Sequence, residues 1–183
     1  WGLIGGIFLA GNYASMIVKA LDPTDQGNAR RWDEFVHGCP EATFFHRAAW
    51  QGILRDVFRH PTHFLYTEQA GQITGVLPMA HVKSRLFGNA LTAMSFAVYG
   101  GVAASNAEAA KALEDEAQKL ARKLDVEHLE FRNMSARHAD WPTQDLYVTF
   151  RKEILPDPEA NMQAIPRKQR AMVRKGIKNG LIS

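Results

Sequence analysis

The sequence predicts a mixed α/β domain of layered type, in which helices flank a β-sheet, and three observations support this class. Residues 46–59 carry apolar side chains at helical spacing. Residues 62–68 and 73–83 are rich in apolar and β-branched residues and flank a turn, as in a hairpin. Residues 106–132 then give a second helical pattern followed by an alternating strand. At 183 residues and 46% apolar content, the chain suits one soluble domain with a real core.

The first half of the chain predicts a strand, two helices and the hairpin. Residues 17–21 read as a strand, and residues 28–37 read as a short helix stopped by Pro40. The helix at residues 46–59 ends before Pro61. Its members at helical spacing form one apolar stripe: Trp50, Ile53, Leu54, Val57 and Phe58.

The second half predicts one long helix between strands. Residues 90–104 read as a strand or extended loop with a sharp turn at its glycines. Asn106 is suited to cap a helix to about Leu124, with Leu113 and Ala117 on its buried face and Glu114 on its solvated side. Residues 127–132 and 146–151 each predict a strand. A final helix begins at Asp157-Pro158, is interrupted by Pro166 and closes at Asn179-Gly180.

The chain has a single cysteine, which excludes an internal disulfide framework. Cys39 lies beside Pro40 and is predicted to be a small buried side chain rather than a nucleophile.

The first residues of the chain are unusual. Residues 1–15 contain no charge, and Met16 precedes a strand-like start. We predict that residues 1–15 are a non-native leader or upstream read-through; a membrane anchor is the alternative.

The positive charge of the chain is concentrated at one end. The whole chain has 22 Lys and Arg against 19 Asp and Glu. Residues 165–181 hold six bases and no acid, so the rest has 16 bases and 19 acids, a charge of −3. The six are Arg167, Lys168, Arg170, Arg174, Lys175 and Lys178. Such a segment predicts contact with tRNA, a nucleotide-linked precursor or an anionic membrane surface, or a solvated face that pairs with acids on a second domain.

Several segments, taken in order, resemble FemAB-like proteins, in particular the branch associated with the exosortase/PEP-CTERM exopolysaccharide system. They are residues 73–78 (Ile-Thr-Gly-Val-Leu-Pro), 85–88 (Arg-Leu-Phe-Gly), 94–102 (Met-Ser-Phe-Ala-Val-Tyr-Gly-Gly-Val), 166–170 (Pro-Arg-Lys-Gln-Arg) and 174–176 (Arg-Lys-Gly). The resemblance covers the chain from about Met16 to Ser183.

The resemblance implies a GCN5-related N-acetyltransferase-like fold, with a mixed sheet flanked by helices, and two such domains in tandem. Residues 16–163 would form the first acyltransferase-like domain, and residues 164–183 a basic helix that leads to a second domain of the same protein. The implied activity is acyl or aminoacyl transfer to an amine in cell-envelope or exopolysaccharide biogenesis. The donor would be aminoacyl-tRNA or acyl-coenzyme A, with no permanently bound cofactor, and the acceptor a lipid- or nucleotide-linked precursor. The implied location is the cytoplasm, including the inner face of the bacterial membrane.

Two alternatives stay open at this point. In the first alternative, the chain is a non-catalytic module that binds a substrate or a partner domain. In the second, it is an acetyl-coenzyme A-dependent N-acetyltransferase. We expect residues 16–183 to be inactive without the second domain.

The substrate-binding prediction falls on two segments. Tyr99, Gly100 and Gly101 combine a hydroxyl with glycines whose N–H groups suit close approach of a ligand; a tight turn is the other reading. The resemblance favours substrate contact there. The second segment consists of the basic residues Arg167, Lys168, Arg170, Arg174 and Lys175. No residue is assigned as the catalytic base, because acyl transfer needs positioning and oxyanion donors rather than a dedicated nucleophile.

Two further motifs are set aside. Residues 85–90 match an Arg-x-x-Gly-x-Ala pattern that binds pyrophosphate in this fold, but an extended segment rather than a helix is predicted after it, so an ordinary turn is favoured. His60 and His63 flank Pro61 without a carboxylate to complete a ligand set, so no metal site is predicted.

Overall fold

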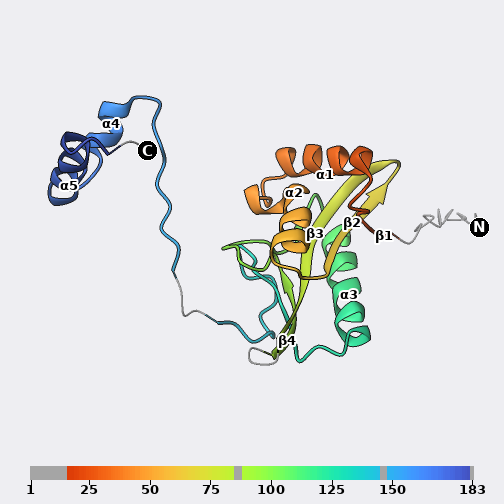
Figure 1. Ribbon diagram of the computed structural model, residues 1–183. Helices are drawn as coiled ribbons and strands as arrows, with labels where there is room; N and C mark the ends of the chain where they lie inside the picture. Colours follow the sequence, from red (N-terminus) through yellow and green to blue (C-terminus); the bar gives the residue numbers. More distant parts are fainter. Residues whose placement is uncertain (1–15, 85–87, 145–147, 182–183) are drawn as a thin grey trace, which may run out of the picture. The chain divides into compact units, whose positions relative to one another are not determined.

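The computed structural model describes residues 16–84, 88–144 and 148–181, which divide into two compact units (Figure 1). The first unit extends to Trp141 and holds the sheet, and the second begins at Pro142 and holds the basic helix. Residues 142–163 therefore group with that helix rather than with the sheet. The predicted leader, residues 1–15, lies outside the described residues, and the tandem second domain stays a prediction.

The predicted class, a mixed α/β fold with a sheet flanked by helices, is confirmed. In the described part of the chain the sheet has six strands in the order β1-β2-β3-β4-β6, with β5 paired to β3. All neighbours are antiparallel except β4 and β6, which are parallel. The strands are β1 (Ile17–Ala20), β2 (Thr62–Gln69), β3 (Gln72–Ser84), β4 (Gly88–Ala93), β5 (Ala103–Ala104) and β6 (His128–Glu130).

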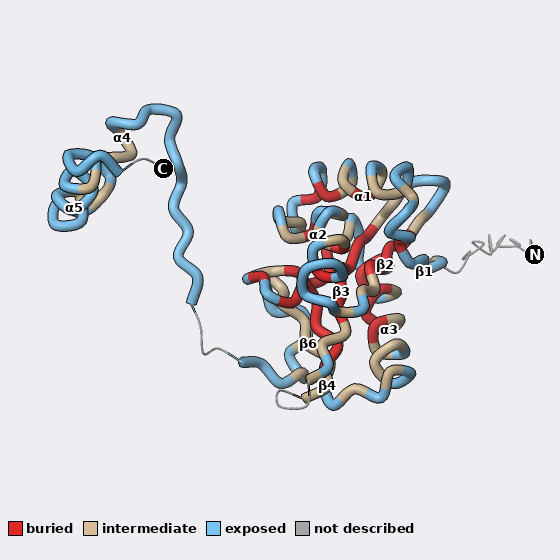
Figure 2. Tube along the Cα trace, viewed as in Figure 1, coloured by how far each residue is buried: buried red, intermediate tan, exposed pale blue. Residues whose placement is uncertain are grey.

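Two hydrophobic cores lie on opposite faces of this sheet, because successive side chains of a strand alternate. Tyr66 pairs with Val76 on the face that also buries Trp32 and Val36 of α1 (Gln26–Gly38). Leu65 pairs with Leu77 on the other face, which packs against α3 (Ala107–Lys123). The buried parts of the trace follow β2 and β3 between the helices (Figure 2). The unit thus has three layers.

Both long helices of the first unit begin where a side chain caps them. The Asp25 carboxylate accepts from the backbone N–H of Asn28, and the Asn106 side chain accepts from that of Ala109. Each cap satisfies an N–H that the helix itself leaves without a partner. The predicted cap at Asn106 is confirmed.

The single helix predicted at residues 46–59 is wrong in detail. The segment contains a 3-10 turn (η1, Phe44–His46), a short α-helix (α2, Ala49–Gly52) and a π-helix (η2, Ile53–Val57). The Phe58 N–H donates to the carbonyl of Ile53, five residues back, which widens the turn. Leu54 is therefore fully buried, whereas Val57 is 70% exposed and no continuous apolar stripe forms.

Three strand predictions change in extent. The segment at residues 90–104 consists of β4, a loop at residues 94–102, and β5. The strand at 127–132 is confirmed but shorter, as β6. Of the strand predicted at 146–151, residues 146 and 147 lie outside the described residues and residues 148–151 form no strand.

The second unit contains α4 (Pro158–Gln163) and α5 (Arg167–Lys178). Asp157 caps α4, as predicted, and Pro166 separates the two helices. Gly180 has a φ of 74°, which suits the turn that ends α5. Neither helix contains a buried residue.

Candidate functional site

The loop of residues 94–102 lies at the carboxyl ends of the two parallel strands. β4 and β6 pair from Ala90 opposite His128 to Thr92 opposite Glu130. Parallel strands end at the same edge of a sheet, so the loop that leaves β4 meets the segment that follows β6. In open sheets with parallel strands, this edge is where ligands bind.

The segment after β6 holds this loop in place. The Arg132 guanidinium donates from Nη1 to the carbonyl of Ala97 at 2.7 Å. The Arg132 carbonyl accepts from the N–H groups of Gly100 and Gly101, at 3.1 and 3.3 Å. The Asn133 Oδ1 accepts from the Val102 N–H at 3.2 Å. The loop is therefore fixed by four bonds from two consecutive residues.

Close packing explains why residues 100 and 101 are glycines. A Cβ at Gly100 would lie 1.9 Å from the Cβ of Met94, and one at Gly101 would lie 1.8 Å from Oδ1 of Asn133. Their N–H groups donate to Arg132, so they are not open donors for a ligand. The geometry thus favours the tight-turn reading of these glycines. Tyr99 is half-buried, and its contact with substrate stays a prediction.

The start of the loop stores backbone strain. Met94 and Phe96 have φ values of 50° and 66°, in the left-handed region that non-glycine residues rarely adopt. Between them, Ser95 is only 3% exposed, and its hydroxyl has no hydrogen-bond partner among the described residues. Strain and an unpartnered buried donor at a strand end are typical of binding and catalytic sites. Our sequence predictions gave Ser95 no role, although it lies in the segment 94–102 that resembles FemAB-like proteins.

A stack of aromatic rings covers the outside of this loop. The Phe96 ring stacks on Phe58 with centroids 4.4 Å apart, and on the His60 imidazole at 5.6 Å. Phe96 is 55% exposed although it is large and apolar. The loop therefore presents an apolar, planar surface to solvent beside the buried Ser95.

His46 connects the helical layer to the same loop. Its Nε2 lies 2.9 Å from the carbonyl of Gly101, and its Nδ1 accepts from the N–H of Thr43 at 3.0 Å. A carbonyl only accepts, so Nε2 carries the proton and the ring is neutral. Burial lowers the pKa of His46, which keeps the ring in this form.

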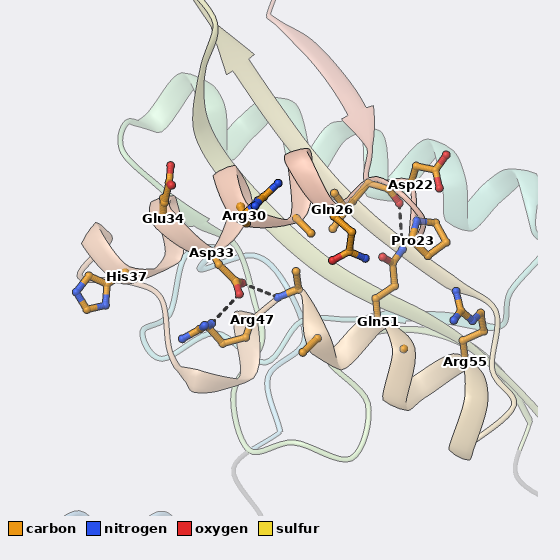
Figure 3. A pocket seen from close by; sticks show the side chains of 15 residues that line it. Asp22, Pro23, Gln26, Arg30, Asp33, Glu34, His37, Arg47, Gln51 and Arg55 are labelled. Carbon is orange, nitrogen blue, oxygen red and sulfur yellow. Dashed lines mark hydrogen bonds and ion pairs between the residues drawn. The ribbon is translucent and has the colours of Figure 1, made fainter.

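An open cavity of about 720 Å³ lies between α1 and α2 (Figure 3). Asp33 is occupied there: it pairs with Arg47 at 3.0 Å and accepts from the Ala48 N–H. Along the same side of α1, Arg30, Glu34 and His37 have no partner among the described residues. The cavity thus offers a guanidinium and a carboxylate four residues apart.

Glu114 corrects a sequence prediction. It was placed on the solvated side of its helix, but it is 5% exposed. Its carboxylate lies 2.7 Å from Nε of Arg137 and 3.1 Å from Nε2 of His138. The pair fastens the segment after β6 to α3, so Glu114 has a structural role that helical spacing alone did not reveal.

The other predicted site residues lie in the second unit. Arg167, Lys168, Arg170, Arg174 and Lys175 are brought together on α5. Tyr99, Gly100 and Gly101 belong to the first unit, and the contact of the basic residues with substrate stays a prediction. Of the pyrophosphate-like motif, Arg85 to Phe87 lie outside the described residues; β4 begins at Gly88, so an extended segment follows, as predicted.

Comparison with solved structures found three acetyltransferases among those similar to this chain. A GNAT family acetyltransferase of Staphylococcus aureus is 10% identical, with a TM-score of 0.49, over 76% of this chain and 98% of that one. A ribosomal-protein-alanine N-acetyltransferase of Brucella melitensis is 13% identical, with a TM-score of 0.47, over 74% and 100%. An aminoglycoside 6'-N-acetyltransferase of Acinetobacter haemolyticus is 13% identical, with a TM-score of 0.48, over 76% and 99%. No model of a protein family matches the chain, and no curated protein matches it.

The described residues contain neither a cluster of metal-binding side chains nor a helix that could cross a membrane. No group of three or more His, Cys, Asp or Glu side chains in residues 16–84, 88–144 and 148–181 is placed to hold a metal ion. Across the same residues, every helix is too short or too polar to cross a membrane.

Proposed function

We propose that the chain is part of a FemAB-like acyl or aminoacyl transferase, which forms an amide bond between an activated acyl group and an amine. The loop of residues 94–102 carries this proposal. There, strained backbone lies beside a buried hydroxyl that has no partner among the described residues. The loop is at the carboxyl ends of the parallel strands, where open sheets bind ligands.

Ser95 is the candidate oxyanion donor of this reaction. The amine nitrogen attacks the acyl carbonyl carbon, and negative charge gathers on the carbonyl oxygen. The bond to the thiol or tRNA hydroxyl then breaks, and that leaving group takes up the proton lost by the amine. A buried O–H aimed at the developing charge stabilises this transition state more than it would in water. The N–H groups of Gly100 and Gly101 are already engaged, whereas the Ser95 hydroxyl has no partner among the described residues and is therefore the donor that we propose.

The cavity between α1 and α2 is the candidate acceptor site. Glu34 attracts an ammonium group, and Arg30 a carboxylate or phosphate, so a molecule with both groups suits this cavity. Such a molecule fits the amine acceptor of an amide-forming transferase. The assignment to the cell envelope or exopolysaccharide system, and the second domain, rest on the resemblance of the sequence to FemAB-like proteins.

The test is transferase activity of the full-length protein, with acetyl-coenzyme A and aminoacyl-tRNA as separate donors and amino sugars or amino acids as acceptors. We expect Ser95→Ala to lower kcat by about 100-fold with little change in KM, because the hydroxyl acts on the transition state. The matched control is Ser135→Ala, whose side chain is exposed and has no partner among the described residues. Equal kcat in both variants contradicts the role of Ser95.

The assays with the two different acyl donors distinguish the proposed function from its alternatives. Turnover with acetyl-coenzyme A alone identifies an N-acetyltransferase. Absence of turnover with either donor, together with binding of a carrier, identifies a non-catalytic module and overturns the proposal. Residues 16–183 by themselves should show no turnover; activity of that fragment contradicts the need for a second domain.

A further inference from the structure

Helix α5 has a strongly basic face. It contains six bases and no acid between Arg167 and Lys178. At about 100° per residue, Arg167, Arg170, Arg174 and Lys178 fall within one side of the helix, with Lys168 and Lys175 at its margin. Arg170 makes one contact, at 3.3 Å to the carbonyl of Ile165, and no acid of the described residues pairs with any of the six.

The opposite face of α5 is apolar and exposed. Met172 is 66% exposed, Val173 is 39% exposed and Ile177 is 62% exposed. Leu181 continues this surface beyond the helix and is 74% exposed. No residue of α5 or α4 is buried, so the second unit does not cover this face itself.

The combination of the two faces distinguishes the partners that a basic helix can have. Nucleic acid neutralises Lys and Arg through its phosphates but leaves an apolar face in water. A bilayer with anionic lipids satisfies both faces at once: the bases meet the headgroups, and the apolar side chains enter the boundary of the acyl chains. A helix of 12 residues is about 18 Å long, which suits a helix that lies in the surface and does not cross it.

We propose that α5 binds the surface of a bilayer containing anionic lipids, with Met172, Val173 and Ile177 inserted below the headgroups. The acids of the second unit lie outside α5, between residues 145 and 159, so none of them offsets the positive charge within the helix. This inference does not depend on the proposed transferase activity. Binding of α5 to the membrane would hold a transferase close to lipid-linked acceptors, whichever acyl donor the enzyme uses.

The test is flotation of the chain of residues 1–183 with phosphatidylcholine vesicles that contain phosphatidylglycerol, compared with pure phosphatidylcholine vesicles. We expect binding only to the anionic vesicles, weakened by added salt. Arg170→Glu with Arg174→Glu should reduce the partition coefficient at least about tenfold, since each base near such a surface contributes about 1 kcal/mol. Met172→Ser with Ile177→Ser should also reduce it, because these side chains supply the apolar contact.

The matched control is Lys119→Glu with Arg122→Glu, which makes the same change of charge on the exposed side of α3 and should bind vesicles normally. Circular dichroism of each variant checks that it folds. Binding that survives the α5 charge reversal comes from another segment, such as residues 1–15, and overturns the inference. A second result would also overturn the inference: the serine variants of the apolar face bind vesicles normally, and tRNA competes with the vesicles for the protein. That result would identify a nucleic-acid contact. Absence of binding to anionic vesicles overturns the inference as well.

Discussion

Helices α3 and α5 have the same kind of sequence and opposite surroundings. Both carry apolar residues on one side and charges on the other, at helical spacing. In α3 that side is packed on the sheet, with Leu113 and Ala117 fully buried. In α5 the corresponding side chains, such as Ile177, are exposed. The comparison teaches that periodicity predicts a helix and its apolar side, but not what covers that side.

The largest expected difference between the two helices is in core truncation. Leu113→Ala should lower the free energy of unfolding by about 2–5 kcal/mol, because it leaves a cavity under the sheet. Ile177→Ala should change it by less than about 0.5 kcal/mol, since no packing is lost. Urea unfolding followed by circular dichroism measures both. A large loss for Ile177→Ala would mean that α5 packs on the first unit and that its apolar face is not free.

The next effect concerns charge on α3 itself. Glu114→Gln should destabilise by about 1–3 kcal/mol, because the partly buried Arg137 guanidinium loses its 2.7 Å pair and keeps only the Glu41 carboxylate, at 3.8 Å. Glu116→Gln, on the exposed side of the same helix, removes only a surface pair with Lys119 and should cost less than about 1 kcal/mol. Equal values for the two variants would show that burial of Glu114 does not matter for stability.

The smallest effect is a dependence on pH, which only the first unit should show. Burial lowers the pKa of His46 below its ordinary value of 6.5, so the unfolded chain binds this proton more readily than the folded one. Its contribution is therefore fully present above about pH 6.5 and is lost as the pH falls through the lower, folded pKa. The free energy of unfolding measured between about pH 7.5 and about pH 5 should fall.

Two histidine variants test whether His46 causes this fall in the free energy of unfolding with pH. His46→Gln should make it shallower, and the exposed His37→Gln should not. Part of the slope should remain in His46→Gln, because burial also lowers the pKa of His63. An unchanged slope in His46→Gln would show that the ring is not held neutral by burial.

The sequence predicted the features that depend on near neighbours. The cap at Asn106 and the buried face at Leu113 follow from spacings within one helix, and both are confirmed. The π-helix at residues 53–57 was missed because the sequence pattern assumes 3.6 residues per turn. The burial of Glu114 was missed because its partner Arg137 is 23 residues away.

In the candidate site, too, the sequence predicted local features and missed those that depend on residues distant in the chain. A sharp turn at Gly100 and Gly101 was predicted, with substrate contact favoured as the role of these glycines, but the packing against Met94 and Asn133 that requires glycine is contained in no local pattern. Ser95 lies within a segment that resembles a family, but it stands out from its neighbours only because its buried hydroxyl has no partner among the described residues. The basic residues of α5 were found from composition alone, and their partner remains a proposal.

The clamp on the loop also has a consequence for how the chain is assembled. Val102 is bonded to Asn133, 31 residues later, so the ribosome releases the loop well before the residues that shape it. Contacts this distant in sequence form slowly, and β6 reaches β4 only after α3 has crossed the sheet. We therefore expect the nascent hairpin to be in place while residues 94–102 still sample many shapes. The strained backbone at Met94 and Phe96 would be among the last features of the molecule to appear.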